Sequence, residues 1–422
     1  MSIVYNQKRA SDLVVSGRHM REAWINGKKI WPETPVDWGD WFVVQYKNIS
    51  SVKIYIKQNP GESLEIDWGD GHTEIITGLT LDYGSKIQHA YTERRSRIIK
   101  FRGEIYGIRF SDYTDINLVY DINTKDKIPE LEYILNIPEW FKPGEANYMF
   151  AGCSSLLTVP WFDLTKADYC LGMFQGCSKL VEIPPLDFSK SKGVNDLFAW
   201  CPMLMRLPDL NFRNSASISG AFANCVLLEK VKLITGNFRV LDSMTYTFYN
   251  CKNLVLIDGN IDSTYDVPFG TAVSASCMFM NCYKLQNIPF GNVQGIQNFT
   301  SCFENCKSLV EISGLTFHNA RWLRRMFAGC SNLIRIEMLL RYEREGYLNE
   351  YLIGSMFKDC ILLSILDITT IVNFRDEYDG IYPCDYKESS WNPADYPFEN
   401  CRALQRDAIP KSMRWMYDKY YQ

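Results

Sequence analysis

The chain has 422 residues, 46% of them hydrophobic and 22% charged. This composition excludes wholesale disorder. The length suits two or three domains, or one long repeat array with attachments. The formal net charge is −4, and without a long basic run the sequence does not show the clustered Lys and Arg of a nucleic-acid-binding surface. No stretch reaches the roughly 18 apolar residues of a membrane span, and the start carries no apolar segment of signal-peptide length.

Residues 1–35 are predicted to form an N-terminal hairpin and attachment segment. Residues 12–16 are typical of a short strand, and residues 23–25 and 28–31 of a tight hairpin, because Asn26-Gly27 supplies the two positive-φ positions of a type I′ turn. A hairpin of this size is not stable alone, so it either packs on the next domain or attaches the chain to another protein. The attachment candidates are Trp24, Asn26, Gly27 and Trp31.

This hairpin reads Trp24-Ile25-Asn26-Gly27-Lys28-Lys29-Ile30-Trp31-Pro32. The phrase resembles a Val-Asn-Gly-Lys-x-Val-Trp-Pro opening of bacteriophage structural proteins. The resemblance is confined to this short segment. It implies a virion component whose N-terminal segment contacts other virion proteins.

Residues 36–118 alternate apolar and polar side chains as strands do, in runs at 42–46, 52–56, 63–66, 97–101 and 105–108. Short strands separated by turn signals predict an immunoglobulin-like β-sandwich. Within this region lie Asp67-Trp68-Gly69-Asp70-Gly71 and, later, His89-Ala90-Tyr91. These two motifs resemble the Trp-x-Gly-Asp-Gly and His-x-Tyr signatures of the polycystic-kidney-disease type of immunoglobulin-like domain.

Asp67, Asp70 and His89 also invite a metal-binding or acid–base interpretation, because clustered carboxylates bind hard cations and His is a common catalytic base. We favour a structural role for them. Gly69 and Gly71 permit a tight turn in which Asp side chains accept hydrogen bonds from nearby backbone amides. We therefore expect no metal here.

Residues 119–410 are predicted to form a solenoid that consists of a cap and ten repeats. The N-terminal cap candidate is Ile134-Leu135-Asn136-Ile137-Pro138, which echoes the later repeat without its cysteine. Terminal repeats are usually atypical, because they close the core against solvent. Residues 411–422 are assigned to a C-terminal cap.

The phrase Phe-x-x-Cys-x-x-Leu occurs ten times in register between Phe150 and Leu404. The interval is 24 residues for the first three steps and again from Cys282 to Cys330, which is the signature of a repeat architecture. The regularly spaced copies contain Phe150, Cys153, Leu156, Phe174, Cys177, Leu180, Phe198, Cys201, Leu204, Phe222, Cys225, Leu228, Phe303, Cys306, Leu309, Phe327, Cys330 and Leu333.

Each repeat is predicted to form one coil of strand, crossing segment, and short helix or 3-10 turn. The stretch 180–188 alternates as a strand does, and Leu197, Phe198 and Cys201 have the i, i+1, i+4 spacing of a helical turn. One coil cannot bury its own apolar face, so stacked coils form a continuous core in which equivalent residues make ladders. The fold class is therefore mainly β with short helices.

The cysteines of the repeat are predicted to be reduced and to fill a narrow slot as small apolar residues. Alternate disulfides along a ladder would distort a regular stack. Zinc is disfavoured although Cys302-x-x-x-Cys306 lie close in sequence, because Cys302 occupies a column of methionines and no His lies at zinc-site spacing. We expect no cofactor and no metal.

The repeat resembles the leucine-rich repeats of BspA-type surface proteins, in the subgroup with Met-Phe-x-Gly-Cys-x-x-Leu. Such proteins resemble adhesins and interaction modules more than enzymes. Longer intervals place extra loops at 262–273, 341–350 and 374–393, and loops on a rigid scaffold are favoured sites of partner contact. The last loop, which contains Trp391, is the preferred site, although it suits a capping role equally well.

An enzyme is disfavoured, because the sequence offers four His, no phosphate-binding glycine loop and no nucleophile motif. The leading hypothesis is a bacteriophage virion structural protein, of the tail or head fibre or decoration type, which displays its repeats for binding a host surface protein, a host glycan or another virion protein. The alternatives are a BspA-type bacterial cell-surface adhesin and an intracellular interaction scaffold. Homo-oligomerisation is left open.

Overall fold

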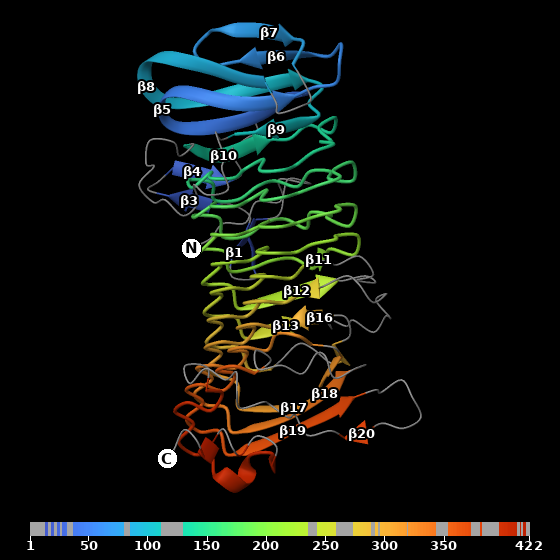
Figure 1. Ribbon diagram of the computed structural model, residues 1–422. Helices are drawn as coiled ribbons and strands as arrows, with labels where there is room; N and C mark the ends of the chain where they lie inside the picture. Colours follow the sequence, from blue (N-terminus) through green and yellow to red (C-terminus); the bar gives the residue numbers. More distant parts are fainter. Residues whose placement is uncertain are drawn as a thin grey trace.

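The computed structural model describes residues 37–79, 85–110, 130–234, 243–258, 273–287, 292–293, 296–318, 320–342, 353–372, 380–381, 396–411, 414 and 417–418, together with four short N-terminal strands. The described parts form an elongated body, with an antiparallel sheet at one end and a stack of parallel coils below it (Figure 1). The fold class predicted from the sequence, mainly β with a repeat solenoid, is confirmed.

Two hairpins lie near the N-terminus. Strand β1 (Leu13–Val15) pairs antiparallel with β2 (Arg18–Met20), and β3 (Ala23–Ile25) pairs antiparallel with β4 (Lys28–Trp31). The second pair is the hairpin predicted from Asn26-Gly27. The two turn residues themselves lie outside the described residues.

Six antiparallel strands form the N-terminal sheet, in the order β10-β5-β8-β6-β7 with β9 also paired to β5. Their bounds are β5 (Phe42–Lys57), β6 (Ser63–Asp67), β7 (Thr73–Thr77), β8 (Ser85–Gly103), β9 (Gly107–Arg109) and β10 (Leu131–Asn136). The runs predicted as separate strands at 42–46 and 52–56 are two halves of the single strand β5. Register shifts between Tyr46 and Ser51 mark the bulge where the long strands bend (Figure 1).

The bend places both halves of β5 and β8 around one core. Phe42 and Ile54, from the two halves of β5, are both fully buried, as are Leu64 of β6 and Phe101 of β8. Alternate residues of these strands face inward, because successive side chains of a strand point to opposite faces. The sheet therefore curves around the apolar side chains on its inner face.

Below the sheet, the strand side of the solenoid is built from parallel pairs one coil apart. Glu311 pairs with Arg335, and Arg335 with Ile365. The strands are β11 (Leu210–Asn211), β12 (Lys230–Ile234), β13 (Leu256–Asp258), β14 (Val273–Ser274), β15 (Asn292–Val293), β16 (Ile296–Asn298), β17 (Glu311–His318), β18 (Arg335–Tyr342) and β19 (Ile365–Val372), with β20 (Gly380–Ile381) antiparallel to β19.

Strand length varies with proline. The stretch 180–188, predicted as a strand, contributes only an isolated bridge between Glu182 and Arg206, because Pro184 and Pro185 have no N–H to donate to a ladder. The corresponding stretches of β17, β18 and β19 contain no proline and run for eight residues each. Proline thus keeps the first coils irregular and its absence lets the last coils form a continuous sheet.

The Phe-x-x-Cys side of each coil consists of consecutive tight turns, not of the expected helical turn. In the first coil, Phe150 and Gly152 donate their N–H groups to the next coil, to Met173 O at 2.9 Å and Gln175 O at 2.7 Å. Ala151 and Cys153 instead donate locally, each to the carbonyl three residues earlier. Positive φ angles cause this alternation: Gly152 has φ 71°, which a right-handed helix does not allow.

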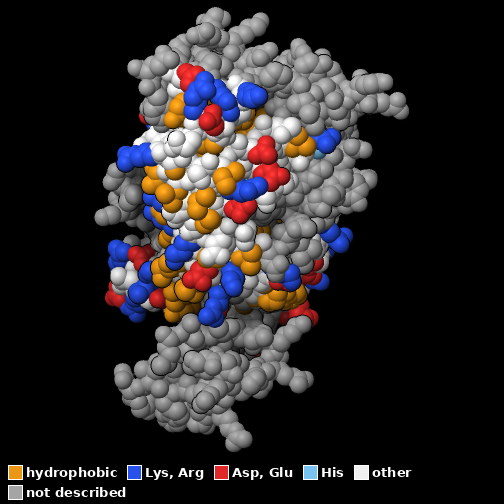
Figure 2. All heavy atoms as spheres, turned by 90° about the horizontal axis from the view of Figure 1, so that it is seen from below, with side chains coloured by type: hydrophobic (Ala, Val, Ile, Leu, Met, Phe, Trp, Pro, Cys, Tyr) orange, Lys and Arg blue, Asp and Glu red, His pale blue; other side chains and the backbone are white. Residues whose placement is uncertain are grey.

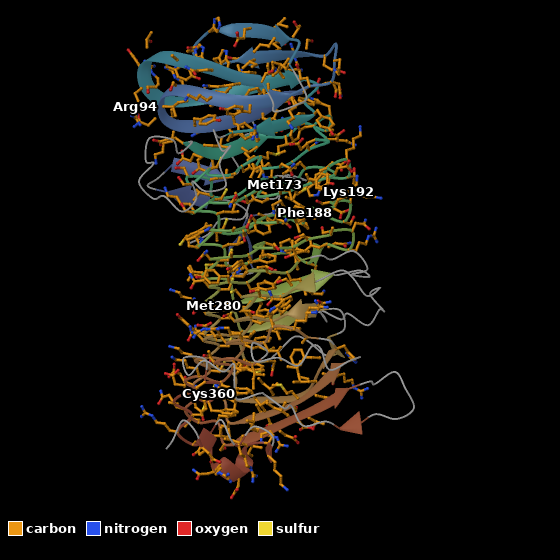
Figure 3. All side chains as sticks on the ribbon, in the orientation of Figure 1. Arg94, Met173, Phe188, Lys192, Met280 and Cys360 are labelled. Atoms are coloured by element: carbon orange, nitrogen blue, oxygen red, sulfur yellow. The ribbon has the colours of Figure 1, made fainter. Side chains whose placement is uncertain are left out.

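The core of the solenoid is a ladder of stacked phenylalanine rings. Ring centroids lie 5.5 Å apart for Phe150 and Phe174 and 5.4 Å apart for Phe174 and Phe198, and the stack continues through every repeat to Phe398. Figure 3 shows the stacked turns on one edge, where Met280 and Cys360 are labelled, and Lys192 projecting from the opposite edge.

The sheet and the solenoid share this core. Phe110 of the sheet domain stacks between Phe42, at 6.0 Å, and Phe150, at 5.7 Å, and its N–H donates to Met149 O. Ile134, in the predicted N-terminal cap, belongs to strand β10, whose partner is β5. The whole sheet therefore closes the top of the solenoid in place of a single degenerate coil.

At the other end, a 3-10 helix, η6 (Arg406–Ala408), follows the last repeat. Leu404 and Ile409 are buried on either side of it, and Arg406 forms an ion pair with Asp418 at 2.5 Å. These contacts close the bottom of the stack. Within the segment assigned to the C-terminal cap, Trp415, Tyr420 and Tyr421 lie outside the described residues.

Candidate binding surface

The Phe, Cys and Leu residues that define the repeat lie in the hydrophobic core. The Phe, Cys and Leu columns of the regularly spaced repeats, from Phe150, Cys153 and Leu156 to Phe327, Cys330 and Leu333, are fully buried. Because water and partners do not reach these atoms in the folded chain, the residues that define the repeat build the scaffold and leave recognition to positions that vary between copies.

The repeat cysteines are free and hydrogen-bonded. Every cysteine in the described part of the chain is a free thiol. From the second repeat onward, each repeat thiol lies close to the carbonyl oxygen of the Phe one coil earlier, for example Cys177 Sγ at 3.1 Å from Phe150 O. Burial raises the pKa of the Cys225 thiol to about 12, so the thiolate form needed for metal binding or nucleophilic attack is absent near neutral pH.

The Asp67–Gly71 turn connects β6 to β7. Asp67 Oδ1 accepts a hydrogen bond from Gly69 N at 2.9 Å, and Asp70 Oδ1 accepts one from His72 N at 3.0 Å. Gly69 has φ 75°, and a Cβ there would lie 2.2 Å from Ile98 O, so glycine is required. The two carboxylates thus hold the turn, and no group of metal-binding residues occurs among the described residues.

Side chains from β8 complete this turn. His89 Nε2 lies 2.8 Å from Asp70 Oδ2, and its ring stacks on the buried Trp68 at 4.9 Å. Tyr91 donates its hydroxyl to Trp68 O at 2.9 Å. Burial alone would raise the pKa of Asp70, but hydrogen bonds with His89 and from the His72 amide lower it below the usual value. The carboxylate therefore stays ionised as a structural acceptor.

The structure describes only some of the other candidate residues predicted from the sequence. Trp24 belongs to β3 and Trp31 to β4, whereas Asn26 and Gly27 lie outside the described residues. The three loops proposed for partner contacts, at 262–273, 341–350 and 374–393, also lie almost wholly outside them, and Trp391 with them. No helix in the described ranges is long and apolar enough to cross a membrane.

The described surface offers instead an exposed column on the strand side of the solenoid, four residues after each repeat cysteine. We call it the aliphatic column; its members are Leu157, Val181, Met205, Val255, Val310 and Ile334. Glu229 and Gln286 interrupt it, and Ser364 and Gln405 occupy the position in the last two coils. Leu157, Met205, Val310 and Ile334 are 38%, 46%, 49% and 42% exposed.

Backbone hydrogen bonds hold members of this column directly above one another. Met205 N donates to Val181 O at 3.0 Å, and Ile334 N donates to Val310 O at 2.8 Å. The next residue along each coil is charged in several repeats, as in Glu182, Arg206 and Lys230. The result is an apolar stripe beside a row of mixed charge, a combination that suits protein contacts.

The apolar surface continues to the end of the stack. In the last coils, Ile361, Leu362 and Ile365 are exposed, and Figure 2, which views the molecule from that end, shows hydrophobic side chains gathered between Lys/Arg and Asp/Glu side chains. This surface was not predicted from the sequence, because the prediction rested on the positions that the repeats share. The signal was present in the aliphatic residue that follows the repeat leucine in most copies.

One family matches the solenoid. The family described as BspA type leucine rich repeat region matches residues 145–255, 194–271 and 273–378, in 6 copies, which together span more than half of the chain. No curated protein matches. Among solved structures, the plant peptide hormone receptor RGFR1 in complex with RGF2 aligns at 14% identity with a TM-score of 0.21, over 55% of this chain and 42% of the receptor chain. The chain thus spans less than half the length of that receptor chain.

Proposed function

Because the chain belongs to the BspA-type leucine-rich-repeat family, we propose that it is a non-enzymatic binding protein whose solenoid adheres to another protein. The aliphatic column is the observation that carries this proposal. Monomeric proteins bury most large apolar side chains, and contiguous exposed apolar patches mark interaction sites. Leu157, Met205, Val310 and Ile334 keep a large part of their surface in water on a rigid backbone.

In its finer form, the proposal places the chain on a bacteriophage virion, with the N-terminal hairpin as the attachment to other virion proteins and a host surface protein as the target of the solenoid. The hairpin phrase around Trp24 and Trp31 supports this location. We also assign the N-terminal sheet to the polycystic-kidney-disease-like class. The Asp67–Gly71 turn and its contacts with His89 and Tyr91 support that assignment.

A second candidate is a bacterial cell-surface adhesin, favoured by the family match itself. Location separates the two. Mass spectrometry of purified phage particles should contain peptides of this chain if it is a virion protein. Their absence from the particles, together with their presence in the surface fraction of the bacterium that encodes the chain, would establish the adhesin instead.

Adhesion is tested with the labelled full-length chain on intact bacterial cells, measured by flow cytometry. The variant Met205→Asp/Ile334→Asp places two charges on the aliphatic column and should reduce binding by about tenfold or more, since each buried apolar contact contributes roughly 1.5–3 kcal/mol. Ile75→Asp is the matched control, because Ile75 is 71% exposed but lies on β7 of the N-terminal sheet. Equal loss in the control, or binding unaffected by the double variant, would contradict the proposal.

A further inference from the structure

Three consecutive coils near the end of the stack expose five large aliphatic side chains. They are Val310, Ile334, Ile361, Leu362 and Ile365, each between 38% and 49% exposed, and we call them the terminal patch. Backbone hydrogen bonds hold the three coils together, since Ile334 N donates to Val310 O at 2.8 Å and Ile365 N donates to Ile334 O at 3.1 Å. Figure 2 shows hydrophobic and charged side chains next to one another at this end of the molecule.

An acidic pair lies beside the terminal patch. The parallel register of β18 and β19 sets Arg335 next to Ile365 and, two residues further along, Glu337 next to Asp367. Both carboxylates are exposed, and like charges at such neighbouring positions destabilise a sheet. Among the described residues, no Lys, Arg or His forms an ion pair with Asp367. The free chain therefore retains a repulsion here that a cation from another molecule would relieve.

The cations of β18 leave this negative charge in excess. Arg335 lies 3.4 Å from a carboxylate oxygen of Glu311 and 3.5 Å from one of Glu337, so one guanidinium serves two carboxylates through long contacts. Arg341 lies four residues beyond Glu337 on the same strand, which is roughly 13 Å along it. The border of the terminal patch on the strand side is therefore acidic.

The cations on the turn side of the patch have other contacts. Lys307 and Arg402 hold the repeat position of Ile361, one residue after the cysteine, in other coils. Lys307 Nζ lies over the Tyr283 ring at 5.0 Å, and Arg402 Nε donates to Asn400 Oδ1 at 2.8 Å. Neither cation forms an ion pair with a described carboxylate, so neither neutralises the acidic border.

The spacing of the coils favours a helical occupant. Neighbouring strands lie about 4.8 Å apart, so a segment that runs along the stack meets a new coil at each step of that length. One turn of an α-helix rises about 5.4 Å, which exceeds the coil spacing by only about 0.6 Å. Side chains on one face of an extended strand repeat every 6.7 Å or so, about 2 Å too long, and lose register within two coils.

We propose that the terminal patch binds an amphipathic α-helix of the partner protein, with a Lys or Arg of that helix placed between Glu337 and Asp367. Apolar residues at i, i+4 and i+7 of the helix form one stripe and supply one side chain for each of the three coils, at Val310, Ile334 and Ile365. The inference rests on the proposed protein-binding function and deepens it, because it names the structure and the charge of the bound segment.

The probe is a fluorescein-labelled synthetic peptide of about 18 residues, a length that supports an isolated helix. Its alanine-rich sequence carries leucines at i, i+4, i+7 and i+11 and a lysine immediately before each leucine. Titration with the full-length chain, followed by fluorescence anisotropy, should show saturable binding, and circular dichroism should show a gain in helix. A peptide with glutamate in place of lysine, and one with two prolines in the middle of the helix, should each bind about tenfold more weakly.

The acidic pair is tested with Glu337→Gln/Asp367→Asn, which removes both charges and keeps the shape of both side chains. This variant should bind the lysine peptide about fivefold more weakly, because charge pairs at an exposed border contribute modestly. Glu182→Gln/Glu229→Gln is the matched control, since it removes two charges from the strand side of earlier coils. The control should bind the lysine peptide nearly as tightly as the unmodified chain.

Equal binding of the lysine and glutamate peptides, equal binding of the proline peptide, or unchanged binding by the acidic-pair variant would each overturn the proposal. So would a dimer of the chain that Leu362→Asp dissociates in analytical ultracentrifugation, because the occupant would then be a second copy. Failure of the peptides with cell binding retained would overturn the helical partner and leave the proposed function standing. Peptide binding without cell binding would support this site and count against adhesion.

Discussion

Cys201 Sγ lies 3.0 Å from the backbone carbonyl oxygen of Phe174, one coil above it. The same contact recurs down the stack. The Phe174 carbonyl also accepts the N–H of Cys177 at 3.1 Å, so the thiol gives this buried acceptor a second donor. Alanine at the same position would lose that second hydrogen bond.

Buried, hydrogen-bonded thiols should be unreactive in the native chain. Burial raises the pKa of Cys330 and of Cys401 to about 12, so their thiolate fraction is negligible at pH 8. With Cys384, which lies outside the described residues, replaced by serine, iodoacetamide should label the half-buried Cys277 first. The repeat cysteines should react only in denaturant. Peptide mapping checks this, and rapid native labelling of the repeat cysteines would contradict the ladder.

The sheet and the solenoid should unfold together, because Phe110 joins their cores. Phe110→Ala should lower the free energy of unfolding by about 3–5 kcal/mol and should separate the transitions of the two parts in urea, followed by tryptophan fluorescence and circular dichroism. Phe188→Ala is the control. Phe188 is equally buried but packs on Phe212 within the solenoid, so this variant should destabilise the chain without separating the transitions. Two transitions already present in the unmodified chain would refute the shared core.

Two glycines with the same backbone angle should respond differently to substitution. Gly176 and Gly329 both have φ 73°, so alanine is strained at either, at about 1–2 kcal/mol. A Cβ on Gly176 would meet only Gly152, whose Cα and N lie 3.6 Å away, whereas a Cβ on Gly329 would lie 2.2 Å from Asn305 Oδ1. Gly329→Ala must also displace Asn305, which donates to Asn281 Oδ1 at 2.9 Å.

Gly329→Ala should therefore cost about 1 kcal/mol more than Gly176→Ala, as measured by urea denaturation. Gly176→Asn should be nearly neutral, because Asn224 occupies the equivalent position two coils later with φ 63°. Equal losses for the two alanine variants would show that Asn305 moves aside without cost. A large loss for Gly176→Asn would contradict the account of the turn by its φ angle.

The same positions show how far the sequence could be interpreted. The repeat columns could be predicted because their spacing repeats, and burial of Phe150, Cys153 and Leu156 follows from stacking. The turn type could not be predicted from Leu197, Phe198 and Cys201, because consecutive tight turns give the same i, i+1, i+4 spacing as a helix. The useful signal was Gly or Asn immediately before most repeat cysteines, which indicates a positive φ angle.

Contacts between neighbouring coils had a weaker sequence signal. Tyr148 and Asp196 occupy the same position of the repeat, five residues before the cysteine, in the first and third coils. In the second and fourth coils this position holds glycine, where a Cβ would lie 2.4 Å from the Tyr148 ring at Gly172 and 2.1 Å from Asp196 Oδ1 at Gly220. Sequence periodicity predicts what is the same in each coil, whereas contacts between residues that differ from coil to coil appear only in the structure.

Asp196 should be visible in the pH dependence of stability. Burial raises the pKa of Asp196 from 3.8 to about 6, so the folded chain binds a proton more tightly than the unfolded chain. This contribution is fully present below about pH 4, is lost as pH rises through about 6, and leaves the ionised carboxylate destabilising at neutral pH. Because one pKa unit corresponds to about 1.4 kcal/mol, Asp196→Asn should raise the free energy of unfolding at pH 7.5 by at most about 3 kcal/mol.

At pH 4 the variant and the unmodified chain should be equally stable, because Asp196 is then protonated in the folded state. Urea denaturation at the two pH values measures the difference, with Asp168→Asn as the exposed control that should change little at either. A residue that stabilised the fold would give the opposite sign, with Asp196→Asn less stable at neutral pH. A gain in stability at neutral pH with none at pH 4 would show that the buried, ionised Asp196 carboxylate destabilises the folded chain.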